Sequence, residues 1–145
     1  MTATAPSQRF IDYFQPEQFQ RLRTLMTSKK VQSGTSLFQD RTDCLYFIHE
    51  GIVKIVNNTE TGEEIAFSLK YAGDLVGEPC TIPTSFQWST AITLTDTFLG
   101  VIHKQDLESL LLRHPDLALR FIQWLTANQR ILETKIRDLL TYGKT

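Results

Sequence analysis

The sequence is poor in cysteine and lacks any long apolar run. Only two cysteines, Cys44 and Cys80, occur among its 145 residues, and they form no C-x-x-C pair. This argues against a structural zinc site and a disulfide scaffold, so we interpret both as small buried side chains, with a redox-active thiol as the alternative. No apolar run reaches the roughly 18–20 residues that cross a bilayer, and residues 1–6 do not resemble a secretory signal. We therefore expect a cytoplasmic protein without membrane contact.

The sequence also lacks the motifs that carry catalysis. His49, His103 and His114 are not spaced as metal ligands, and no nucleophile elbow, zinc-protease motif or phosphate-cradling glycine loop is present. A metalloenzyme built on a β-barrel would need converging histidines, and no H-x-H pair occurs. The sequence therefore predicts a protein that is not an enzyme, with no metal site and no cofactor in this chain.

Positive charge is unevenly distributed along the chain. Residues 1–112 hold nine Lys or Arg against 13 Asp or Glu, whereas residues 113–145 hold six basic against three acidic residues. A basic C-terminal helix can border a nucleic acid or another polyanion. It can equally be the solvated face of an ordinary helix, so both interpretations stay open.

Helical periodicity opens and closes the chain, and short β segments fill the middle. Pro16 begins a helical pattern, whereas glycines recur between Lys30 and Lys104 with alternating apolar segments and no helix between them. Such a pattern is typical of antiparallel sheets folded as a jelly roll, so we predict a mainly β fold with flanking helices. The predicted organisation is a helical lead-in over 1–29, a β jelly-roll domain over 30–104, a short helix over 105–114 and a long helix over 115–142.

The long helix carries apolar residues at heptad spacing, as a two-stranded coiled coil does. A second apolar row, which includes Leu117 and Trp124, can pack on the β domain. Two rows favour a homodimer through the first row, although a single intramolecular amphipathic helix is the alternative. Asn128 resembles the polar residue that sets register in such seams. The predicted seam residues are Phe121, Leu125, Asn128, Leu132 and Leu139.

Four motifs follow one another in the β segments: Val31-x-x-Gly34, Leu45-Tyr46-Phe47-Ile48-x-x-Gly51, Gly62-Glu63-Glu64-Ile65 and Ala72-Gly73-Asp74-Leu75-Val76-Gly77-Glu78. Their order and spacing resemble the cyclic-nucleotide-binding-domain family. Within that family, the long closing helix resembles the dimerisation helix of Crp/Fnr transcription regulators, and its last residues resemble Gram-positive Fnr-like regulators. The resemblance covers nearly all of residues 30–140 and implies a jelly-roll sensor domain.

The resemblance implies an effector pocket at one segment of the sheet. In family members that bind cAMP, a Gly-Glu turn presents backbone N–H groups to the cyclic phosphate and the Glu to the ribose, and an Arg followed by Ser or Thr binds the phosphate. Gly77 and Glu78 match the turn here, and Ser89 and Thr90 match the hydroxyl positions. The position of the Arg holds Trp88. These five residues are the candidate pocket.

The missing cation predicts that cAMP does not bind with physiological affinity. No Lys or Arg occurs between Lys70 and Lys104. A phosphate monoanion there would lose a charge-assisted hydrogen bond of roughly 1.5–3 kcal/mol. The pocket is then either filled by its own apolar side chains or takes an uncharged or aromatic effector that stacks on Trp88.

The resemblance to Fnr-type regulators also makes an iron–sulfur cluster a candidate cofactor. Residues 1–29 contain no cysteine, so the N-terminal ligand set of enteric Fnr is absent. In the Gram-positive type, the resemblance implies three cysteines near the far C-terminus and an aspartate at the end of the dimer helix, where Asp138 stands. A cluster would then need ligands beyond Thr145, and an ordinary solvated Asp138 is the alternative.

These observations predict the effector-sensing and dimerisation domain of a Crp/Fnr-type transcription regulator. DNA binding would belong to a helix-turn-helix domain missing after residue 145, and RNA polymerase is a possible further partner. The alternative is a stand-alone binding module that regulates a partner protein. The identity of any effector, and whether the protein activates or represses, stay open.

Overall fold

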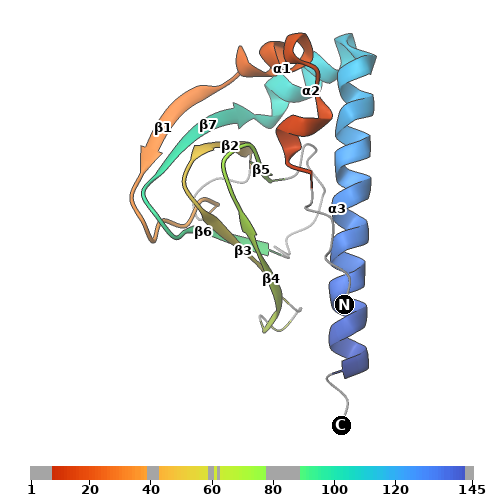
Figure 1. Cartoon of the computed structure of the whole chain (residues 1–145). Coiled ribbons are helices and arrows are strands. Elements are labelled where there is room, and N and C mark those ends of the chain that lie inside the picture. Colours follow the sequence, from red (N-terminus) through yellow and green to blue (C-terminus); the bar gives the residue numbers. More distant parts are fainter. Residues whose placement is uncertain (1–7, 39–42, 59–60, 62, 78–88, 143–145) are drawn as a thin grey trace.

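The computed structural model describes residues 8–38, 43–58, 61, 63–77 and 89–142, with most residues beyond 128 described by their backbone alone. Seven strands lie within these ranges and form two antiparallel sheets beside one long helix (Figure 1). The four-stranded sheet has the order β1-β7-β2-β5 and the three-stranded sheet the order β4-β3-β6. The strands are β1 (Thr27–Val31), β2 (Cys44–Glu50), β3 (Val53–Asn58), β4 (Glu64–Lys70), β5 (Leu75–Val76), β6 (Ser89–Thr93) and β7 (Thr97–His103).

Helices lie before and after the sheets. A 3-10 turn, η1 (Phe10–Tyr13), leads into α1 (Pro16–Arg23), which begins with a proline whose missing N–H costs nothing in the first turn. After β7 come α2 (Lys104–Arg113) and α3 (Pro115–Tyr142), which stands along one side of the sheets (Figure 1). The mainly β fold with flanking helices was predicted. The first strand begins at Thr27, however, inside the segment predicted as the helical lead-in.

Strand β2 is buried on both faces and separates two hydrophobic clusters. Leu45 and Phe47 belong to the cluster under the helices, whereas Tyr46 and Ile48 belong to the cluster between the sheets. The split follows from the strand period of two, which sends successive side chains to opposite faces. The first five residues of β2 are buried, so this strand forms the centre of the domain.

Aromatic rings fasten η1 to α3. Phe10 is fully buried, and its ring centroid lies 5.2 Å from that of Phe121 and 5.1 Å from that of Trp124 on α3. It also lies 6.2 Å from the ring of Phe47 on β2. One side chain thus joins the lead-in, the sheet and the long helix.

The change Phe10→Ala removes this junction. Truncation of a buried Phe leaves a cavity, and we expect the free energy of unfolding to fall by about 3–5 kcal/mol. Urea unfolding measured by circular dichroism checks this. The matched control is Leu112→Ala on α2, where the side chain is 84% exposed and the change should be close to neutral. An equal loss in both variants would contradict the assigned role of Phe10.

A polar clamp joins α1 to the start of α3. The Arg21 Nη2 atom lies 2.8 Å from Asp116 Oδ2, and Gln18 donates to the same oxygen at 3.2 Å. The hydrogen bonds from Arg21 and then Gln18 lower the pKa of Asp116 to about 2. The ionised carboxylate is therefore the form that the fold favours.

This clamp predicts a pH-dependent effect of Asp116→Asn. The folded pKa of Asp116 lies below the value of about 3.9 for an unfolded chain, so its stabilisation is present above about pH 4 and is lost as the pH falls toward 2. Thermal unfolding should give a lower midpoint for the variant at neutral pH, with a difference that shrinks between pH 4 and pH 2. The exposed-carboxylate control Glu108→Gln should show no such trend, and a pH-independent difference would contradict the clamp.

Candidate functional site

The structure describes both ends of the predicted effector pocket. Gly77 follows β5 with a φ of +118°, which only glycine adopts without strain. An added Cβ there would lie in ordinary van der Waals contact, 3.4 Å from Leu45 Cα on β2, so the need for glycine comes from the backbone angle. Ser89 and Thr90 begin β6, where they pair with Asn57 and Val56 of β3. Glu78 and Trp88 lie outside the described residues.

Two further cations, Lys54 and Arg120, make contacts that the structure describes. On β3, Lys54 Nζ lies 4.9 Å from the centroid of the Phe67 ring, a cation–π contact. On α3, Arg120 is half-buried, its Nη1 donates to Gln123 at 3.2 Å, and its Nε is buried without a hydrogen-bond partner among the described residues. The sequence places Arg120 in the basic C-terminal helix, and no pattern in it signals the buried atom.

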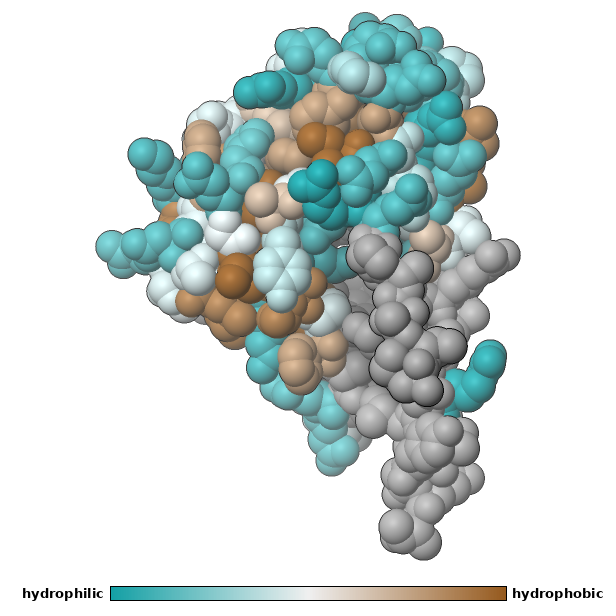
Figure 2. Space-filling model, viewed as in Figure 1, coloured by the Kyte–Doolittle hydropathy of each residue, from teal (hydrophilic) through white to brown (hydrophobic). Residues whose placement is uncertain are grey.

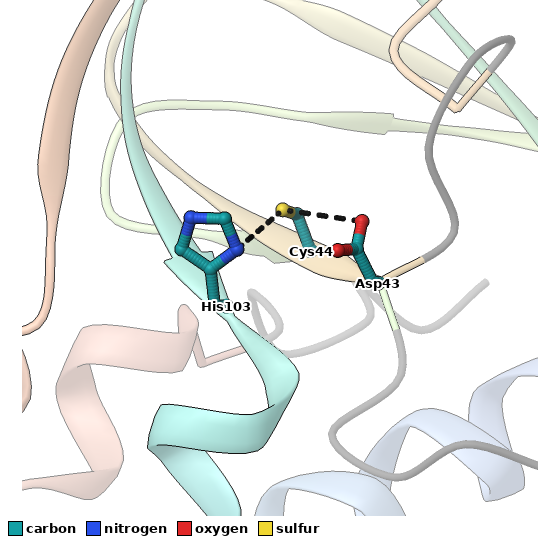
Figure 3. Close-up of side chains that lie close together, drawn as sticks. All are labelled: Asp43, Cys44 and His103. Carbon is teal, nitrogen blue, oxygen red and sulfur yellow. Dashed lines mark hydrogen bonds between the residues drawn. The ribbon is translucent and has the colours of Figure 1, made fainter.

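Strand pairing brings together three potential metal ligands that the sequence separates. Cys44 on β2 pairs directly with His103 on β7, and Asp43 precedes Cys44 (Figure 3). Cys44 Sγ lies 3.4 Å from His103 Nδ1 and 3.6 Å from Asp43 Oδ1. Cys44 is fully buried, His103 is half-buried and Asp43 is exposed. The histidine spacing predicted no metal cluster, because only the register of the sheet makes these residues neighbours.

The long helix presents one apolar row to the β domain and another to the outside. Leu117, Phe121 and Trp124 are buried against the lead-in and the sheet. Leu119, Ile122 and Leu125 are 52%, 59% and 38% exposed. The division follows from helical spacing, since residues three or four positions apart share a face.

One residue of the predicted seam is therefore reassigned. Phe121 is 2% exposed and belongs to the core of the protomer, so it has no surface for a second copy. Asn128 lies seven residues later and is half-buried, so its place in the seam stays a prediction. Leu125 remains in the outer row. Leu132 and Leu139 continue that row by spacing, but their side chains lie outside the described residues.

The described residues do not supply a ligand set for an iron–sulfur cluster. Such clusters are held mainly by cysteine thiolates. Cys44 lies on β2 in the cluster between the sheets, and the chain has one further cysteine, Cys80, outside the described residues. The side chain of Asp138 also lies outside them. The prediction for Asp138 therefore lies outside the described residues.

Comparison with known families assigns the chain to a family. Residues 28–114 match the cyclic nucleotide-binding domain family. The chain belongs to this family. The match covers the two sheets and α2, which confirms the predicted fold class.

Relatives of this cyclic nucleotide-binding domain include regulators. The chain is 29% identical over 136 residues to the Anaerobic regulatory protein of Bacillus subtilis (strain 168), across 92% of this chain and 57% of that protein. The predicted resemblance to Crp/Fnr regulators is thereby confirmed. The chain spans less than two thirds of this relative's length.

Solved structures share the fold. The Catabolite Activator Protein of Thermus thermophilus superposes with a TM-score of 0.73 at 22% identity, over 92% of this chain and 63% of that chain. The sensor domain of the transcriptional regulator DNR from Pseudomonas aeruginosa gives a TM-score of 0.63 at 22% identity, over 86% of each chain. Identities this low show a common fold only. Among the described residues, no helix is long and apolar enough to span a membrane.

Proposed function

We propose that this chain is the effector-sensing and dimerisation part of a Crp/Fnr-type transcription regulator, and that it pairs with a second copy of itself through the outer row of α3. The observation that supports pairing is the exposed row of Leu119, Ile122 and Leu125. Three large apolar side chains in a row on one helix face are costly to leave in water, and a second identical helix covers them most simply.

The proposed regulator role rests on the similarity to the Anaerobic regulatory protein of Bacillus subtilis. The Anaerobic regulatory protein is longer than this chain, which covers 57% of it, and that leaves room for a DNA-binding part in a longer parent protein. In our proposal this part follows residue 145, RNA polymerase is a further partner, and the protein acts in the cytoplasm without membrane contact. The role is regulatory, and no catalytic step is assigned to the domain.

The proposed mechanism is a shift between two arrangements of the paired helices. Inner residues such as Phe121 bind α3 to the same core as β2, so a signal in the β domain changes the position of the helix. The outer row transmits this change to the partner's helix, which alters the spacing of DNA-reading elements attached after the helices.

A stand-alone module that regulates a partner protein is the second candidate. It is favoured by an exposed apolar group on the three-stranded sheet and the loops beside it (Figure 2). Such patches often mark protein contacts. Its members are 38–56% exposed: Phe67, Leu69, Tyr71, Ile92 and Leu94.

The double change Ile122→Asp with Leu125→Asp tests the helix pairing. Two carboxylates in each outer row would be buried beside their counterparts in the dimer, so we expect a monomer by light scattering, whereas the unaltered chain is a dimer. The matched control is Leu112→Asp, an exposed leucine of α2 outside the row, which should leave the dimer intact. A dimer that persists in the double variant would mean that the interface lies elsewhere.

Calorimetry with cAMP tests the predicted loss of nucleotide binding. We expect no binding in the micromolar range for the unaltered chain, since Trp88 stands where cAMP-binding relatives have an arginine. Trp88→Arg should restore measurable affinity by returning the charge-assisted bond to the phosphate. Micromolar binding by the unaltered chain would contradict the prediction. If that binding were lost in Arg120→Gln, Arg120 would be the replacement cation.

A further inference from the structure

We propose that Asp43, Cys44 and His103 form a binding site for one divalent transition-metal ion such as Zn²⁺. The three side chains offer oxygen, sulfur and nitrogen, the donor types that this ion prefers. Their ligand atoms all lie within 4.8 Å of one another. The site goes beyond the proposed regulator function and does not depend on it.

The distances fit a tetrahedral ion. Bonds of about 2.0–2.3 Å place neighbouring ligand atoms of a tetrahedral site about 3.3–3.8 Å apart. The Sγ–Nδ1 distance of 3.4 Å and the Sγ–Oδ1 distance of 3.6 Å both lie in this range. Figure 3 shows the imidazole and the carboxylate on either side of the sulfur. The exposed Asp43 side chain can rotate to close the remaining distance to His103.

The backbone holds Cys44 and His103 in place before any ion binds. Cys44 and His103 are a cross-strand pair of the antiparallel β2–β7 ladder, so their side chains leave the same face of the sheet. The carbonyl of Asp43 accepts a hydrogen bond of 2.8 Å from the Lys104 N–H, which ties the start of β2 to the start of α2. Such preorganisation lowers the entropy that metal binding must overcome.

Binding changes the protonation of the cysteine. The Cys44 S–H bond breaks, the Sγ–metal bond forms and the proton passes to water, with no change in oxidation state. Three protein ligands leave a fourth position for water or an exogenous group, as in sites that are not purely structural.

The site lies beside the pocket that lacks a cation. A Cβ added at Gly77 would lie 3.5 Å from the carbonyl oxygen of Cys44, so the start of the predicted pocket packs on the metal-binding strand. No Lys or Arg occurs between Lys70 and Lys104. A bound divalent ion would bring positive charge to this part of the domain.

Titration of the reduced, metal-free chain with Co²⁺ and Zn²⁺ tests the proposal. Co²⁺ should bind one equivalent and produce a thiolate-to-cobalt charge-transfer band, which Zn²⁺ then abolishes by displacement. Loss of a supporting residue around a metal typically weakens binding 10–100-fold, so Cys44→Ser and His103→Gln should each weaken it by at least about 100-fold. Zn²⁺ should raise the thermal unfolding midpoint of the unaltered chain and not that of His103→Gln.

Matched variants keep the result decisive. His49 is also half-buried but lies on β2, where its ring contacts Phe47 and Phe98. His49→Gln should therefore leave Co²⁺ binding unchanged. Asp43→Asn alters an exposed side chain, so it should fold normally and weaken binding even if Cys44→Ser unfolds. No charge-transfer band in the folded, unaltered chain would overturn the proposal, and so would a band that persists in Cys44→Ser. Metal binding is measured on this chain alone. Its outcome therefore does not depend on whether the chain dimerises or takes part in DNA binding.

Discussion

The burial of β2 on both faces is the constraint on which the rest of the structure depends. Its alternate side chains, such as Leu45 and Tyr46, enter two separate hydrophobic clusters. One cluster holds the helices on the sheet, and the other holds the two sheets together. Because β2 lies between β7 and β5, it also sets where His103 and Gly77 lie. The candidate metal site, the start of the pocket and the seat of α3 therefore share one strand.

The position of α3 supports the proposal that a single domain both senses and associates. The buried side of the helix is committed to the core by Leu117, Phe121 and Trp124, so it cannot also meet a partner. The outer side carries Ile122 and Leu125, which have no such commitment. In the proposed dimer, a change in the β domain would act on the buried row and reach the second copy through the outer row.

The jelly roll could be predicted from the sequence, because its signals are local. Glycines at turns and alternating apolar segments mark strands, and Pro16 and Pro115 stand at helix starts. The packing of Leu117 and Trp124 on the β domain was predicted, and the structure confirms it. The place of Phe121 could not be predicted, since two adjacent apolar rows satisfy the same helical period. Phe121 was therefore placed in the seam, and the structure gives the exposed position to Ile122. The cluster of Asp43, Cys44 and His103 was missed because it depends on the register of β2 with β7, 59 residues apart at Cys44 and His103.

Disulfide trapping tests the central claim, the pairing of two chains through the outer row of α3, most directly. Ile122→Cys in a Cys80→Ser background places a thiol in the row, and two such thiols bridge only if the helices bring their Cα atoms within about 7 Å. The account predicts rapid formation of a covalent dimer on mild oxidation, and none for Leu112→Cys in the same background. Equal trapping at both positions, or none at 122 in a protein that is dimeric by light scattering, would contradict it.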